Sequence, residues 1–223
     1  MANVLIEENT MSAIGNAIRE KTGKTDLILP KDMPTEIESI ESGGSSSGQE
    51  LLDAMIDGSI TEIESNAESV KNYAFYYSNN LKSVSFPIAT SIGKNAFNSC
   101  DTLTTVDFPL VTSIGEYAFN SCDALTTVDF PLVTSIEKYA FNGCDKISAV
   151  ILRNAEVLCT LSAANAFAST PIKTGTGYIY VPSALIEDYK VATNWSTYAT
   201  QFRALEDYTV DGTVTGELDE TKI

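Results

Sequence analysis

The sequence predicts an α/β repeat fold in which short parallel strands stack into a solenoid. Near-copies of one unit begin at Leu81, Leu103, Leu125 and Ile147, each 22 residues after the one before. The complete units share L-x-x-V-x-F-P, then T-S-I, then A-F-N-x-C-D. A Gly/Ser run precedes the repeats, and a sequence of different character follows them. We therefore expect a helical N-terminal module, a linker, the solenoid and a strand-helix cap at the C-terminus.

Residues 1–41 are predicted to form a small helical docking module. Met11, Ile14 and Ile18 fall on one face of a helix. Short amphipathic helices cannot bury such a face alone, so we expect this module to dock on another copy, on the rest of the chain or on another protein. Residues 42–49, which contain SGGSSSG, have the composition of a flexible linker.

The solenoid is expected to span residues 50–172 in about five coils, starting with a short capping helix near its N-terminus. In each coil alternate residues point in opposite directions, so Val106 faces the core whereas Thr105 and Asp107 face outward. Stacked coils bury their apolar side chains as continuous columns, and strands of adjacent coils pair in parallel. The last unit carries about four additional residues before Ala166.

Residues 173–223 are predicted to form a C-terminal cap and a polar tail. The run GYIYVP at 177–182 indicates a final strand, and Ser183 is a candidate N-cap for a following helix. The tail can form a hairpin or stay disordered. Six apolar residues are expected to seal the last coil: Leu185, Tyr189, Ala192, Trp195, Tyr198 and Phe202.

Composition excludes several classes of function. Thirty acidic residues against 14 basic ones give a net charge of −16, which disfavours binding to nucleic-acid phosphates and to anionic membranes. Histidine is absent, which excludes Ser-His and Cys-His nucleophile pairs and histidine metal ligands. The N-terminus lacks the features of a secretory signal. We expect no enzymatic activity, catalytic residue, cofactor or metal, and synthesis in the cytoplasm.

Three further residue types recur at the same place in each unit. Cys100, Cys122 and Cys144 are interpreted as small buried hydrophobic groups, because zinc sites need Cys-x-x-Cys spacing or histidines and three stacked cysteines cannot all form disulfides. An aspartate column and an asparagine column are open to two interpretations, a calcium site or hydrogen bonds to the backbone of each turn. These columns contain Asp101, Asp123 and Asp145, and Asn98, Asn120 and Asn142.

The outward side of the strands is the predicted binding face. Its candidate residues are Ser83, Ser85, Thr105, Asp107, Thr127 and Asp129. Asp107 and Asp129 resemble a glycosidase carboxylate pair, but stacking holds them close and exposed, which favours a solvated surface. Tyr73, Tyr76 and Tyr77 are either an aromatic contact patch or part of the core and cap. Lys94, Glu116 and Lys138 vary between copies and are interpreted as unconstrained surface.

The unit LTTVDFPLVTSIGEYAFNSCDA resembles the BspA-like (Treponema pallidum-type) bacterial leucine-rich repeats, over roughly residues 58–172. This resemblance implies a right-handed leucine-rich-repeat solenoid, and members of the family are mostly surface proteins that adhere to proteins or cells. The segment MSAIGNAIREKTGKTDLILPKDMPTEIESI is similar to leader modules of structural proteins from phages and prophages of Gram-positive bacteria.

These resemblances imply a non-enzymatic phage or prophage virion component, of the tail or fibre type. Its repeats would bind a host-surface protein or glycan, and residues 1–41 would bind virion proteins or support a homo-oligomer. The alternative is a bacterial cell-surface adhesin. An enzyme and a non-adhesive scaffold are weaker alternatives.

Overall fold

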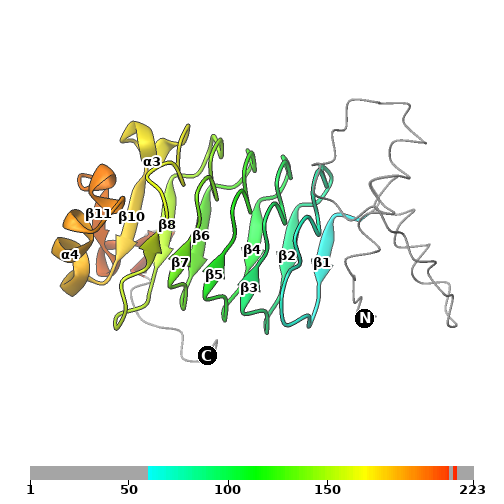
Figure 1. The fold of residues 1–223 in the computed structure, drawn as a ribbon, viewed down its shortest axis with the longest axis horizontal. Coiled ribbons are helices and arrows are strands. Elements are labelled where there is room, and N and C mark those ends of the chain that lie inside the picture. The colour runs from blue at the N-terminus through cyan, green and yellow to red at the C-terminus, as the bar shows by residue number, and fades with distance from the viewer. Residues whose placement is uncertain (1–59, 211–212, 215–223) are drawn as a thin grey trace, which may run out of the picture.

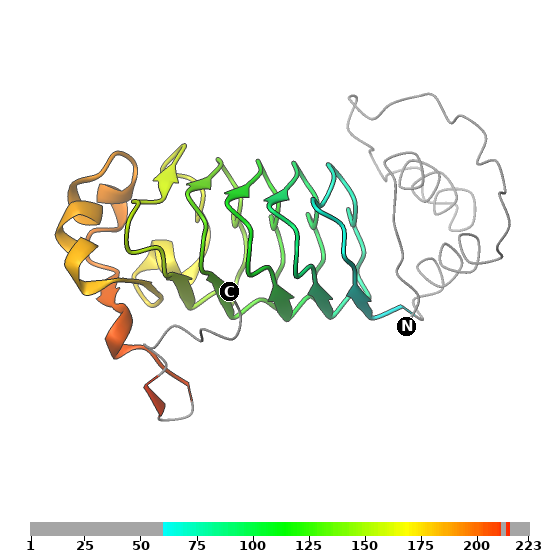
Figure 2. The ribbon, with the colours of Figure 1, turned by 90° about the horizontal axis from the view of Figure 1, so that it is seen from below.

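The computed structural model describes residues 60–210 and 213–214. The predicted docking module at 1–41, the linker at 42–49 and the start of the solenoid at 50–59 lie outside these residues. The coils stack in one direction, and the C-terminal cap closes one end of the stack (Figures 1 and 2). The predicted α/β repeat solenoid with parallel strands is therefore confirmed.

One side of the solenoid is built from a strand of each coil. Its strands are β1 (Glu62–Glu64), β2 (Ser83–Ser85), β4 (Thr105–Asp107), β6 (Thr127–Phe130) and β8 (Ala149–Leu152). A second side has two-residue strands, β3 (Ser91–Ile92), β5 (Ser113–Ile114), β7 (Ser135–Ile136) and β9 (Thr160–Leu161). Every pairing on both sides is parallel.

The third side of each coil consists of turns, which also bond from coil to coil. The backbone N–H of Phe97 donates to the carbonyl of Ala118 at 2.7 Å, and Phe119 donates to Ala140 at the same distance. The turns as well as the strands therefore satisfy backbone groups of neighbouring coils, which explains why the sequence repeats so closely.

Two columns of phenylalanine rings fill the core between the three sides. Successive rings of the first column are stacked with centroids 5.1 to 5.3 Å apart. This column contains Phe75, Phe97, Phe119, Phe141 and Phe167, and the second contains Phe86, Phe108 and Phe130. All eight rings are at most 3% exposed, so the inward placement expected from the repeat is confirmed.

The strand side is interrupted between β4 and β6, which belong to separate sheets, although β5 and β7 remain paired on the next side. Val106 is half-buried at the interruption, whereas Val84 and Val128 are only 2% and 1% exposed. Asp107 and Asp129 occupy equivalent outward positions on the two strands.

The cysteine column lies inside the core, as predicted. Cys100, Cys122, Cys144 and Cys159 are free thiols, each at most 1% exposed. The Cys122 thiol donates to the carbonyl of Phe97 at 3.1 Å, so the thiols also satisfy backbone acceptors. Burial raises the pKa of Cys144 and of Cys159 to about 12.

We expect all four thiols to resist a thiol-specific disulfide reagent in the native protein at pH 8. A thiol with a pKa of about 12 is only about one part in 10⁴ ionised there, and burial blocks access as well. The absorbance of the thiolate that the reagent releases measures the reaction. It should show almost no reaction without denaturant and four reactive thiols per chain in guanidinium chloride. Rapid release from the native protein would contradict the burial of this column.

The C-terminal cap adds two strands to the sheet. β10 (Tyr178–Val181) pairs with β8, and β11 (Phe202–Ala204) pairs with β10. The prediction that residues 177–182 form the final strand is therefore wrong, because the chain returns after its helices to add β11. A hairpin of β12 (Thr209–Val210) and β13 (Thr213–Val214) follows, which is one of the two expected forms of the tail.

Short helices connect these strands. They are α3 (Pro171–Thr174), η1 (Ser183–Leu185), α4 (Ile186–Val191), η2 (Trp195–Tyr198) and η3 (Leu205–Asp207). Ser183 is not an N-cap: it lies inside η1, and its hydroxyl donates to the Glu206 carboxylate at 3.1 Å. The Ser183 hydroxyl therefore bonds the side chain of Glu206, whereas an N-cap hydroxyl would accept a hydrogen bond from a backbone N–H of the helix.

Cap side chains bond the backbone of the last coil. Trp195 Nε1 donates to the carbonyl of Cys159 at 2.6 Å, and the Cys159 N–H donates to the Tyr189 hydroxyl at 2.9 Å. The Tyr198 hydroxyl donates to Ala164, and the Asn194 amide donates to Leu161. Side chains therefore take the bonds that the backbone of a further coil would make.

Trp195→Phe should lower the free energy of unfolding by about 1 to 2 kcal/mol, because the buried carbonyl of Cys159 loses its donor. Chemical denaturation followed by far-UV circular dichroism measures the change. Tyr178→Phe is a matched control on the surface of the cap, and it should change stability by less than about 0.5 kcal/mol. Equal losses in both variants would contradict this account of the cap.

Candidate binding face

The outward side chains of the strands form two columns, which we call the strand face. One column contains Glu62, Ser83, Thr105, Thr127, Ala149 and Tyr178. The other contains Glu64, Ser85, Asp107, Asp129, Ile151 and Tyr180. All six residues predicted for the binding face lie on it, four on the first sheet and two beyond the interruption.

The two aspartates of the strand face have different partners. Asp107 accepts a hydrogen bond from the Ser85 hydroxyl at 3.0 Å. Asp129 forms an ion pair with Arg153 of the next coil. The Arg153 Nε lies 3.0 Å from Oδ1 and 2.9 Å from Oδ2 of Asp129, and its Nη2 lies 2.8 Å from Oδ2. Asp129 is therefore neutralised on the face, whereas Asp107 presents its charge to solvent.

An aromatic group at the C-terminal end of the strand face was missed by the sequence analysis. Tyr178, Tyr180 and Tyr208 are half-buried, with ring centroids 6.5 Å apart for the first pair and 4.8 Å for Tyr180 and Tyr208. The Arg203 guanidinium lies 4.2 Å from the centroid of the Tyr178 ring. The alternation in YIYV was a usable signal, because it places both tyrosines on the outward side of one strand.

The asparagine column bonds in two ways, because the Asn98 amide donates to the Asn95 side chain of its own turn at 2.6 Å, whereas the Asn120 amide bonds to the next coil. The Asn120 amide donates to the carbonyl of Asn142, 22 residues ahead, at 2.9 Å. In the neighbouring aspartate column burial raises the pKa of Asp101 and of Asp123, and repulsion from the adjacent carboxylates raises that of Asp123 further. In the part of the chain that the structure describes, no three acidic or cysteine residues are grouped closely enough to hold a metal ion.

The residues interpreted as unconstrained surface instead form ion pairs across three coils. Glu116 lies 3.5 Å from the Lys94 amine and 3.1 Å from the Lys138 amine. The hydrogen bond and charge of Glu116 raise the pKa of Lys138. The interpretation was wrong because the alternation of charge between copies was taken for random variation.

The tyrosines of the first coil were expected to be either an aromatic contact patch or part of the core and cap, and the structure shows some of each. Tyr73 is buried, Tyr76 is half-buried and Tyr77 is 42% exposed. The Tyr76 ring meets both neighbours edge-on, and burial, followed by the effect of Tyr77, raises the pKa of Tyr76 to about 12. Tyr73 thus belongs to the core, and Tyr77 to the surface.

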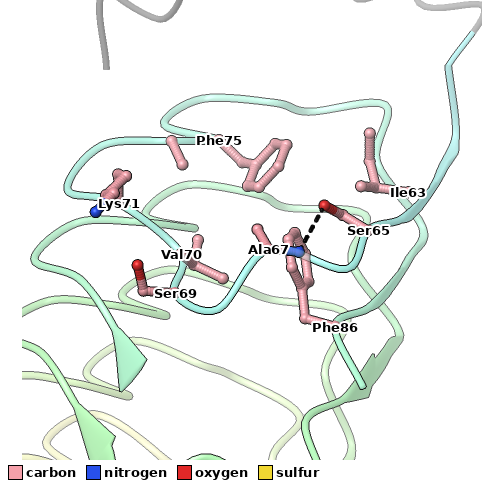
Figure 3. Close-up of a pocket in the computed structure, with 9 residues that line it drawn as sticks. Ile63, Ser65, Ala67, Ser69, Val70, Lys71, Phe75 and Phe86 are labelled. Carbon is pink, nitrogen blue, oxygen red and sulfur yellow. Dashed lines mark hydrogen bonds between the residues drawn. The ribbon is translucent and has the colours of Figure 1, made fainter. Parts of the chain in front are cut away.

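A small hollow of about 20 Å³ lies beside this first coil (Figure 3). Its lining is mostly apolar and includes Ile63, Val70, Phe75 and Phe86. The Ser65 hydroxyl accepts a hydrogen bond from the Ala67 N–H at 3.2 Å within it. The lining contains no acidic residue, so the hollow lacks the convergent charged groups of an active site.

The match to known families agrees with this geometry. A family described as BspA type leucine rich repeat region, in six copies, matches residues 68–185, which is more than half of the chain. The chain belongs to the BspA-type leucine-rich repeat family. Proteins with leucine-rich repeats generally mediate protein interactions, so the BspA-type match supports a role in protein binding or adhesion. No curated protein matches the chain.

Solved structures of bacterial leucine-rich-repeat proteins are similar to this BspA-type chain. A protein from Bacteroides ovatus is 27% identical over 66% of this chain and 40% of its own, with a TM-score of 0.47. The Treponema pallidum leucine-rich repeat protein is 23% identical over 55% and 58%, with a TM-score of 0.47. A leucine rich cell surface protein from Faecalibacterium prausnitzii is 20% identical over 63% and 35%, with a TM-score of 0.48.

This BspA-type chain thus spans less than two thirds of the length of each of these proteins. Within residues 60–210 and 213–214, no helix has the length and apolar character needed to cross a bilayer.

Proposed function

We propose that this BspA-type protein is a non-enzymatic binding protein that recognises its partner through the strand face. The observation that carries the proposal is the separation between core and face: β1, β2, β6 and β10 each bury one set of side chains and leave the alternate set half-buried or exposed. Substituting the outward set leaves the stacking intact, which is what a recognition surface requires.

The finer assignment that we propose is a phage or prophage virion component of the tail or fibre type. It is supported by the similarity of the N-terminal segment to phage leader modules and by the Gly/Ser composition of residues 42–49. Residues 1–41 would attach the protein to virion proteins or to further copies of itself, and the repeats would bind a host-surface protein or glycan. The second candidate is a bacterial cell-surface adhesin, which the BspA-type match favours.

Mass spectrometry of density-purified particles from an induced culture of the source bacterium separates these candidates. A virion component should be present in stoichiometric amount in the particles and scarce in the envelope of unlysed cells. If the protein is absent from particles and present on the surface of unlysed cells, the virion assignment is rejected and the adhesin assignment is favoured. A hydrolase screen on the purified protein tests the non-enzymatic assignment, and turnover above background would overturn it.

A further inference from the structure

The chemistry of the strand face changes along the solenoid. Its first coils carry carboxylates at Glu62, Glu64 and Asp107, all exposed and without an ion-pair partner among residues 60–210. Its middle coils carry threonines. The face is therefore acidic at one end and, as the register shows, becomes aromatic at the other.

The transition occurs at β8, where all four residues are buried, including the outward Ala149 and Ile151 at 8% and 2% exposed. In the register Ile151 lies between Asp129 and Tyr180. Beyond it the half-buried Tyr178, Tyr180 and Tyr208 form edge-on pairs. Tyrosine and arginine are the residues enriched in the energetic centres of protein interfaces, because they provide large contact area at low entropic cost.

We infer that the strand face binds a polypeptide segment that carries lysine or arginine residues for the acidic coils and an apolar or aromatic residue for the tyrosine end. This inference rests on the proposed function and names the class of partner. Charge complementarity selects the basic residues, since the face displays the exposed carboxylates of Glu62, Glu64 and Asp107. The half-buried rings over a buried aliphatic surface select the apolar anchor.

The coil spacing fixes the separation of the two features. Asp107 and Tyr180 lie three strands apart, from β4 through β6 and β8 to β10. At ~4.8 Å per paired strand this is at least about 14 Å, because β4 and β6 are not paired, and an extended peptide needs about four residues to cover that distance. The segment therefore needs its basic and apolar residues separated by at least about four positions.

The experiment uses the full chain and a fluorescein-labelled peptide with a lysine pair, a Gly-Ser spacer of about four residues and a Phe-Leu pair. Fluorescence anisotropy measures binding at low and at physiological salt. Tyr180→Ala should weaken binding at least about fivefold, and Asp107→Asn about two- to threefold with a smaller salt dependence. Matched controls off the face are Tyr77→Ala and Asp145→Asn, and these should bind like the unmodified chain.

A glutamate version of the peptide should not bind. Emission from Trp195, which is the only tryptophan and is 1% exposed, shows whether each variant keeps its cap folded. If Tyr180→Ala unfolds the cap, Arg203→Gln replaces it, with an expected loss of at least about twofold.

Three results would overturn the inference: equal binding of the glutamate peptide, equal effects of face and control variants, or no binding of the lysine peptide by the unmodified chain. Binding of a neutral N-acetylglucosamine oligomer that Tyr180→Ala abolishes would assign the face to glycans instead. Attachment to host cells that depends on Tyr180, with no response to the peptide, would keep the proposed function and reject the basic partner.

Discussion

Phe119→Ala is expected to lower the free energy of unfolding by about 4 kcal/mol. The ring is fully buried and is stacked between Phe97 and Phe141 at 5.2 and 5.3 Å. Rings of the second column, Phe108 and Phe130, meet it from the side at 6.3 and 6.2 Å. Removal leaves a cavity in the middle of the array, where hydrogen bonds to the neighbouring coils limit collapse, and it ends the ring contacts.

Guanidinium denaturation followed by circular dichroism and by Trp195 emission measures this loss. Phe119→Leu keeps most of the volume and should cost less than about 2 kcal/mol. A solenoid holds together through nearest-neighbour interfaces, so the alanine variant should also separate the two probes, since Trp195 reports the cap side. A loss below about 1 kcal/mol for the alanine variant would show that the ring columns do not hold the coils together.

Gly115→Ala is expected to cost about 2 to 3 kcal/mol. A Cβ at this position would lie 2.7 Å from the carbonyl carbon of Gly93 and 2.8 Å from the nitrogen of Lys94. Both contacts are with the backbone of the preceding coil, which cannot rotate away as a side chain can. The two coils must therefore separate locally, which lengthens the bond from the Gly115 N–H to the Ile92 carbonyl, now 2.8 Å.

The next coil provides a matched control for this substitution. Glu137 stands at the equivalent position, already has a Cβ and bonds the Ile114 carbonyl at 3.0 Å. Glu137→Ala should therefore change stability by less than about 0.5 kcal/mol. Thermal and guanidinium unfolding of the two variants measure the difference. Equal stability of both would mean that the coils yield at Gly115 as readily as at Glu137.

The predictable part of this fold is the part that repeats. Residues such as Phe119 and Cys122 must fit copies of themselves in adjacent coils, so their recurrence in the sequence already reports their burial. The outward position of Thr105 and Asp107 followed from the two-residue alternation of a strand. These rules require only local geometry and the period, and the structure agrees with them.

The parts that were missed depend on contacts between non-equivalent residues. β11 pairs with β10 only because the cap helices turn the chain back, and Ser183 bonds Glu206 because η3 folds over it. The repeat pattern likewise does not report that the strand side is interrupted between β4 and β6. Arg153 pairs with Asp129 across a coil that departs from the period, so no repeat alignment places them together.

The cap also covers the C-terminal end of the coil stack. A strand edge with free N–H and carbonyl groups is a template on which another chain can pair, and head-to-tail pairing between copies of a repetitive array does not close into a ring. Trp195, Asn194 and Tyr198 occupy the carbonyls of Cys159, Leu161 and Ala164, which are acceptors that the backbone of another copy would need at this end.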